Sequence, residues 1–399
     1  MKEVSKKCIA VLCACSCFFF PKHLAAVSDR AVKQADLVLS KDKRIGLKRD
    51  QLIQAFDFIE NARQSKNKKS IYSRKQTNLP CTIERCPDMG GYLIRDMNKK
   101  KRVGHGKHKV IQKAIFCGPE TRLVADCDCD DSGKNEIKIL RQLKGKKGIV
   151  PFLGSRSMGK SRHSIYLEYF PEGSLRTLLK HETRFTQEQV MQIALDIVRA
   201  VQTMHKQHLI HRDLHEGNVL LRSTPNKMFE AVLVDFGKTL RASHAKDALP
   251  QTPASKNPPE NLIFPLSKVD RHLGEVYALG CLLYHIVWKE PQPWSYVFNS
   301  RRLDEMSSSK KEKLHDKIVS LYKKTKEEKT GEIVAKEHKK QALTSFEQFQ
   351  LLVFNMLHYN PKKRPSVDFV VQRLKAIKPS TPITYSQEEL VEYLSTILV

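Results

Sequence analysis

The amino-acid sequence predicts an α+β fold with two lobes, a small antiparallel β-sheet followed by a larger, mainly helical part. The length of 399 residues exceeds that of one small domain and suits a two-lobed domain with extensions. Between residues 92 and 169, short β-like runs alternate with turns rich in Gly and Lys, which indicates antiparallel strands. After Gly173 the apolar residues recur at helical spacing. We therefore divide this region into an N-terminal lobe at 92–169 and a C-terminal lobe at 170–375.

Residues 1–28 resemble a secretory signal peptide. A basic start precedes an apolar run at residues 8–20 and small residues around Ala25. The run is too short to span a bilayer. Four of the ten cysteines lie in this segment, so the cysteine count does not support a disulfide framework. We expect an exported or secreted protein, and the alternative is a cytoplasmic protein with a hydrophobic N-terminus.

Residues 29–91 have a polar, helix-compatible pattern whose main apolar group lies between Leu52 and Phe58. We interpret this segment as an N-terminal helical or linker extension.

The remaining elements follow from local signals. One helix is expected around residues 134–143, inserted into the sheet of the first lobe. Thr186 and Gln189 form a capping box that starts the first long helix of the second lobe. The stretch at 300–342 is dense in Lys and Glu and predicts an exposed charged helical insert. A last helix is expected at 376–399.

The net charge of +27 favours nonspecific attraction to acidic surfaces. The lysines are spread over many short runs without interleaved aromatic residues, which argues against a specific nucleic-acid site.

Two motifs, in a fixed order along the chain, contain the main candidate catalytic and metal-binding residues. The first is HRDLHEGN at residues 211–218, and the second is VLVDFG at residues 232–237. They contain the carboxylates of Asp213 and Asp235 and the amide of Asn218, which are groups that can accept a proton or hold a metal ion.

The order and spacing of these motifs resemble the catalytic and metal-binding loops of eukaryotic-type protein kinases. The resemblance covers residues 92–375 and implies the two-lobed protein-kinase-like fold, with ATP and Mg²⁺ as cofactors. By resemblance Asp213 is the catalytic base, and Asn218 and Asp235 are the metal ligands. Arg364 matches the arginine that usually pairs with the glutamate closing the activation segment, here Glu260.

The glycine-rich loop departs from the family pattern. Residues 104–111 resemble that loop, but its third glycine is Lys109, and the strand position that should hold lysine is Cys127. This combination resembles the with-no-lysine kinases, in which the phosphate-binding ammonium comes from the glycine loop. Lys109 is thus expected to replace the strand lysine. Glu136 matches the helix glutamate that usually pairs with that lysine, but its distance from Cys127 along the chain is short, which implies a truncated or shifted helix.

The resemblance also implies a nucleotide site and further catalytic-loop roles. The backbone around Glu168 and Phe170 is expected to face adenine as the hinge between the lobes. The other expected nucleotide contacts, from the glycine loop, the strands and the catalytic loop, are Gly104, Gly106, Ile111, Ala125 and Leu220.

Two catalytic-loop residues are expected to act beside the base. Arg212 would receive the phosphate of an activation-loop phosphosite. His215 stands where serine/threonine kinases usually have lysine, and could contact the transferred phosphate.

Three functions remain open at this point. The first is a protein kinase for serine or threonine, whose protein substrate would lie in a target or host cell if the signal peptide acts. The second is a pseudokinase that binds nucleotide or protein. The third is a small-molecule kinase, which the activation-segment motif and Arg364 disfavour.

Overall fold

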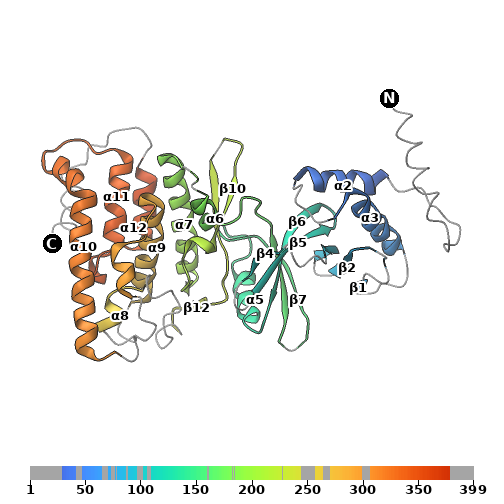
Figure 1. The fold of residues 1–399 in the computed structure, drawn as a ribbon, viewed down its shortest axis with the longest axis horizontal. Helices are drawn as coiled ribbons and strands as arrows, with labels where there is room; N and C mark the ends of the chain where they lie inside the picture. The colour runs from blue at the N-terminus through green and yellow to red at the C-terminus, as the bar shows by residue number, and fades with distance from the viewer. Residues whose placement is uncertain are drawn as a thin grey trace. The chain divides into compact units, whose positions relative to one another are not determined.

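The computed structural model describes most of the chain between Asp29 and Ile377 (Figure 1). The described residues are 29–41, 47–64, 71–72, 77, 79–86, 89–96, 102–105, 109–159, 161–181, 183, 185–226, 228–243, 257–263, 270–298 and 306–377. The predicted signal segment and almost all of the predicted helix at 376–399 lie outside them. None of the described helices is both long and apolar enough to cross a membrane.

The chain divides into two compact units. The first consists of residues 1–86, 90–98 and 115–122, and the second holds the rest of the chain. Helices α2 (Asp29–Lys41) and α3 (Arg49–Gln64) belong to the first unit, together with three short strands. These strands pair antiparallel in the order β1 (Ile71–Tyr72), β2 (Cys81–Cys86) and β3 (Gly91–Asp96).

The predicted helical extension at 29–91 is therefore helical only in its first part. Leu52 and Phe56 of α3 are buried, as the apolar pattern predicts. Strands β1 and β2 follow within the same segment, and β3, which the sequence assigned to the N-terminal lobe, falls in the first unit.

The second unit begins with the expected antiparallel sheet. Its strands pair in the order β4, β5, β6, β8 and β7. Their bounds are β4 (Arg102–His105), β5 (Lys109–Cys117), β6 (Thr121–Cys129), β7 (Phe152–Ser157) and β8 (His163–Glu168). The tip of the β5–β6 hairpin, residues 115–122, counts with the first unit. Helix α5 (Gly133–Gln142) is the inserted helix that the sequence predicts.

The helical lobe follows in the same unit (Figure 1). Its helices are α6 (Leu175–Lys180), α7 (Gln187–Lys206), α8 (Glu260–Ile263), α9 (Arg271–Trp288), α10 (Ser308–His338), α11 (Ser345–Met356) and α12 (Val367–Ala376). Its short strands and 3-10 turns are β9 (Leu209–Ile210), η3 (Glu216–Asn218), β10 (Val219–Ser223), β11 (Phe229–Leu233), β12 (Leu240–Arg241), η6 (Pro293–Phe298) and η8 (Pro361–Lys363). Strand β10 pairs with β11, and β9 with β12.

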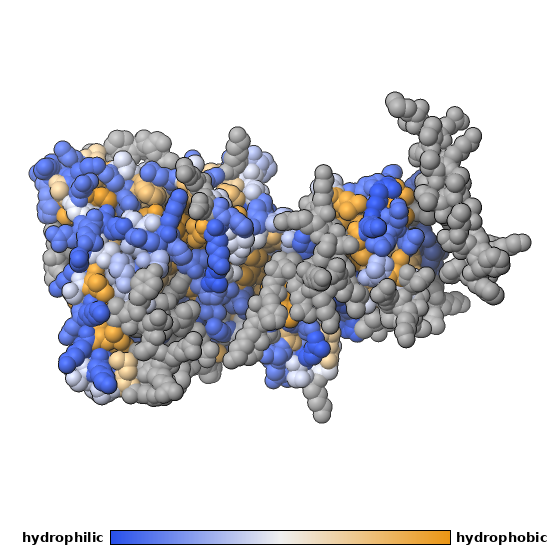
Figure 2. Space-filling view, in the orientation of Figure 1, coloured by the Kyte–Doolittle hydropathy of each residue, from blue (hydrophilic) through white to orange (hydrophobic). Residues whose placement is uncertain are grey.

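Local sequence signals explain where these helices start and what they bury. Thr186 caps α7 with the predicted capping box, and Asp270 caps α9 by accepting hydrogen bonds from two backbone N–H groups. Helix α9 is apolar on nearly every face and is buried on nearly every face. Helix α10 lies inside the predicted charged insert at 300–342 and buries only a few of its residues. In Figure 2 the described surface of this lobe is mostly hydrophilic.

Candidate active site

The catalytic loop, residues 211–218, connects β9 to β10, and Glu275 on α9 holds its backbone. Arg212 has a left-handed backbone (φ +67°), a conformation that costs a non-glycine residue about 1–2 kcal/mol. Its N–H donates to Glu275 Oε1 (3.0 Å), while His205 Nε2 lies 2.8 Å from the other oxygen of that carboxylate. Burial would raise the pKa of Glu275, but the hydrogen bond from His205, the neighbouring His211 and the backbone N–H of Arg212 lower it. Glu275 thus holds the loop as an anion.

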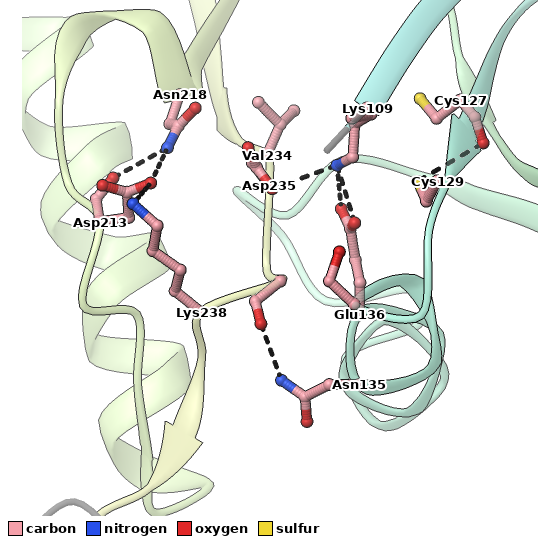
Figure 3. Close-up of polar contacts among 12 residues, drawn as sticks. Lys109, Cys127, Cys129, Asn135, Glu136, Asp213, Asn218, Val234, Asp235 and Lys238 are labelled. Atoms are coloured by element: carbon pink, nitrogen blue, oxygen red, sulfur yellow. Dashed lines mark hydrogen bonds and ion pairs between the residues drawn. The ribbon is translucent and has the colours of Figure 1, made fainter. Parts of the chain in front are cut away.

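Asp213 is buried at the centre of this loop (Figure 3). Its Oδ2 lies 3.0 Å from Lys238 Nζ and 3.4 Å from Asn218 Nδ2, which also donates to the Asp213 carbonyl at 2.9 Å. Its Oδ1 is buried and has no hydrogen-bond partner among the described residues. A buried acceptor without a partner costs free energy unless a ligand supplies the proton. This oxygen therefore suits a substrate hydroxyl.

Asp235 is brought beside Asn218 by strand pairing, because the N–H of Val234 donates to the Asn218 carbonyl at 3.0 Å. Asp235 itself has a left-handed backbone (φ +65°). Burial would raise its pKa, but Lys109 lowers it below the usual value. An amide oxygen and a carboxylate are hard donors that suit Mg²⁺. A magnesium ion held by these two side chains would take its remaining ligands from phosphate oxygens and water.

Lys109 is the first residue of β5, and its ammonium lies between two carboxylates (Figure 3). Nζ is 2.7 Å from Glu136 Oε2 on α5 and 3.1 Å from Asp235 Oδ1. Burial would lower the pKa of Lys109, but these carboxylates raise it well above the usual value. Cys127 on β6 is buried, and burial raises the pKa of its thiol, so this position carries no charge at neutral pH. The ammonium that contacts Glu136 therefore comes from β5, because the residue at 127 on β6 is a neutral thiol.

The expected nucleotide contacts that the structure describes come from β4, β5, β6, β8 and β10 of the second unit, and from Phe170 just after β8. Ala125 on β6 pairs with Leu167 on β8, the residue before Glu168. Ile111, Ala125 and Leu220 are partly buried and pack against the main core, and Phe170 is buried. Gly104 lies in β4, and Gly106 lies outside the described residues.

His215 lies near Asp213, and its Nδ1 already has hydrogen-bond partners. Its Nδ1 accepts a hydrogen bond from the N–H of Gly217 (3.0 Å) and lies 3.1 Å from Arg176 Nη2. Its Nε2 lies 3.9 Å from Asp213 Oδ2, which is outside hydrogen-bond distance. A direct contact with the transferred phosphate stays a prediction.

The segment that closes the activation loop is fixed by a buried ion pair. Arg364 donates from both terminal nitrogens to the two carboxylate oxygens of Glu260 at 2.6 Å each. Both side chains are fully buried, so the predicted pairing of these two residues is confirmed.

Sequence reasoning missed two residues that hold this site. Lys238 directly follows the Asp-Phe-Gly motif and reaches Asp213. Asn135, next to Glu136 on α5, donates from Nδ2 to the carbonyls of Gly237 (3.1 Å) and Thr239 (2.9 Å). The adjacency of each to a recognised motif residue was the available signal.

The chain is similar in sequence to known proteins over much of its length. A family model described as a protein kinase domain matches residues 105–374. A probable serine/threonine-protein kinase of Dictyostelium discoideum is 28% identical over 217 residues, covering 49% of this chain and 18% of the relative. The mitogen-activated protein kinase kinase kinase 3 of Arabidopsis thaliana is 27% identical over 206 residues, covering 50% and 32%.

A third relative matches over a longer stretch. The serine/threonine-protein kinase KIC1 of Saccharomyces cerevisiae is 25% identical over 306 residues, covering 73% of this chain and 25% of the relative. The chain thus spans a third or less of the length of these relatives. Since the domain match covers more than half of its residues, this chain belongs to the eukaryotic-type protein kinase family.

Proposed function

We propose that this chain is an active protein kinase that transfers the γ-phosphoryl group of ATP to serine or threonine hydroxyls of a protein substrate. The observation that carries the proposal is the position of the Lys109 ammonium, which lies between Glu136 and Asp235. A nucleotide site that had decayed would have no reason to keep a partly buried lysine paired with both carboxylates. The serine/threonine kinases among the relatives support the choice of hydroxyl.

Each residue has a role that its surroundings allow. Asp213 accepts or orients the proton of the attacking hydroxyl through its unpartnered Oδ1. Asn218 and Asp235 would hold Mg²⁺, which when bound neutralises charge on the phosphates. Lys109 remains an ammonium at neutral pH and is available to the phosphates. Transfer then depends on positioning and charge rather than on covalent chemistry by the protein.

The test compares phosphate incorporation by the parent protein and by Lys109→Met, with Mg-ATP and a mixture of serine and threonine peptides. We expect the rate of Lys109→Met to fall by roughly 10²-fold or more, the usual cost of removing one preorganised charged donor. Asp213→Asn should be at least as inactive. Lys138→Met, an exposed lysine on the same helix as Glu136, is the matched control and should keep the parent rate.

A second variant separates the relocated lysine from general damage. The swap Lys109→Gly with Cys127→Lys returns the ammonium to β6, and should recover part of the lost rate. If neither the parent nor Lys109→Met incorporates phosphate, the pseudokinase interpretation is correct instead. Transfer to small hydroxylated molecules but not to peptides would favour the small-molecule kinase.

A further inference from the structure

Lys238 occupies a position that the proposed reaction can use. Its Nζ lies 3.0 Å from Asp213 Oδ2, within the range of a charge-assisted hydrogen bond (Figure 3). The other oxygen of Asp213 is the one without a partner. An ammonium at this place would be close to both the attacking oxygen and the phosphoryl group that it attacks.

The backbone around Lys238 is fixed from two sides. Asn135 donates to the carbonyls on either side of it, those of Gly237 and Thr239. Arg212 Nη1 lies 3.4 Å from the carbonyl of Lys238 itself. Such contacts fix the origin of the side chain, whereas a lysine on an unconstrained surface would sample many directions.

The catalytic loop has a histidine instead of a lysine two residues after Asp213. His215 stands where serine/threonine kinases usually have lysine, and its Nδ1 is used by the N–H of Gly217. We propose that Lys238, from the metal-binding loop, replaces that lysine as a second relocated cation and contacts the transferred phosphoryl group.

This inference rests on the proposed kinase function. The hydroxyl oxygen forms a bond to the γ-phosphorus, and its proton passes to Asp213. The bond between the γ-phosphorus and the β,γ-bridging oxygen breaks, and its electron pair leaves with ADP. Lys238 keeps its proton and offsets the negative charge on the phosphoryl oxygens during transfer.

The test measures kcat and KM for ATP in Lys238→Met, with Lys144→Met, an exposed lysine, as the control. We expect kcat to fall by roughly 10²-fold or more, while KM for ATP and the affinity for ADP stay close to the parent values. In the double variant Lys238→Met with His215→Lys, a lysine returns to the catalytic loop and should recover at least roughly tenfold of the lost kcat.

Three outcomes would overturn the inference. Unchanged kcat in Lys238→Met would remove its role while leaving the kinase proposal intact. Increased kcat would mean that the Lys238 ammonium blocks Asp213 instead of assisting it. A parent protein without any transferase activity would end both proposals together.

A basic cavity next to the catalytic loop carries a second, independent inference. It has a volume of about 570 Å³ and lies between α6, η3 and the C-terminal end of α9. Its lining residues are Arg176, Leu179, Lys180, Thr183, Glu216, His285 and Lys289. The cavity is therefore lined by three side chains that are positively charged at neutral pH, Arg176, Lys180 and Lys289, and by one carboxylate, that of Glu216.

The Glu216 carboxylate already lies close to two of the lining side chains. His285 Nδ1 lies 2.9 Å from Glu216 Oε1, and Arg176 Nη2 lies 3.9 Å from Oε2. Lys180 and Lys289 are exposed and form no ion pair with the described residues. Glu290, the neighbour of Lys289, is paired with Lys329 at 2.7 Å. Among the residues that the structure describes, no carboxylate is therefore paired with Lys180 or Lys289.

The cavity is close to Asp213, the proposed base. Arg176 on its wall lies 3.1 Å from His215 Nδ1, and the same imidazole lies 3.9 Å from Asp213. We propose that this cavity binds an acidic side chain of the protein substrate, so that the kinase prefers serine or threonine flanked by Glu or Asp. The preference deepens the proposed function, since it names the class of substrate.

A purely structural explanation predicts a different result. Lys180 lies in the last turn of α6 and Lys289 at the C-cap of α9, where cations are favoured by the helix dipoles. In that case the variants would alter stability but would not change the choice of peptide.

The test uses binding, so that it does not depend on catalysis. Labelled peptides with a central alanine and glutamate, alanine or lysine flanks are titrated into the parent and into the double variant Lys180→Ala with Lys289→Ala. We expect the parent to prefer the glutamate peptide, and the double variant to bind it roughly tenfold more weakly with little change for the alanine peptide. A double mutant of exposed lysines outside the cavity, Lys144→Ala with Lys146→Ala, controls for net charge.

Equal binding of all three peptides by the parent would overturn this inference, as would an equal loss in the control. An acidic preference in a protein that transfers no phosphate would refute the kinase proposal and leave the cavity as a peptide site.

Discussion

At the scale of single residues, Asn135 gives the most direct test of how the metal-binding loop is held. Its two hydrogen bonds to the carbonyls of Gly237 and Thr239 are each worth about 1 kcal/mol. We expect Asn135→Ala to lower kcat/KM roughly tenfold, because the loop that carries Asp235 loses both. Steady-state kinetics at several Mg²⁺ concentrations measure the effect. Lys134→Ala, at the exposed neighbouring residue, should keep the parent rate. An unchanged rate in Asn135→Ala would show that the two hydrogen bonds of Asn135 have no catalytic consequence.

The residues that chemistry requires could be predicted from the sequence, whereas those that position them could not. Asp213, Asn218 and Asp235 are fixed by two motifs, and the structure gathers them at one place. The contact between Lys238 and Asp213 depends on the path of the backbone after the metal-binding loop. The position of Lys238 next to the motif is visible in the sequence, but the direction of the backbone that brings its side chain to Asp213 is not. The roles of these residues in catalysis remain predictions.

At the scale of elements, local signals identify helix starts better than they identify strand partners. The capping box at Thr186 requires only neighbours within one turn, and it is confirmed. The short spacing before Glu136 also has a local explanation. Strand β6 ends at Cys129 and α5 begins at Gly133, so the helix starts after only a short turn. Glu136 lies in the first turn of α5 and still reaches Lys109.

Strands β1 and β2 of the first unit were not predicted, because their pairing is not visible in a short window of sequence. Strands β1 and β2 lie in a segment whose strongest periodic signal is helical, and β1 has only two residues. The β5–β6 hairpin adds residues 115–122 to the same unit. A boundary drawn along the sequence cannot represent a unit built from three separate segments.

At the scale of the whole molecule, His358 links stability to pH. It is buried between α11 and η8, and its Nδ1 accepts the N–H of Asn360 at 3.0 Å. Burial, with the neighbouring cations Lys326, Lys363 and Arg364, lowers the pKa of His358 from 6.5 to about 4. Between these values the unfolded chain binds a proton at this residue that the folded chain does not. Stability therefore falls as the pH falls from 6.5 to 4.

We expect this residue to contribute about 2 kcal/mol to the loss of unfolding free energy between pH 7.5 and pH 5. The variant His358→Asn keeps an acceptor for the N–H of Asn360 but does not titrate, so its free energy of unfolding should change less over this interval by that amount. Urea unfolding of both proteins at the two pH values measures the difference. His181→Asn, at an exposed histidine, should follow the parent. If His358→Asn and the parent lose the same stability, the proton is bound equally in both states and the depressed pKa of His358 is wrong.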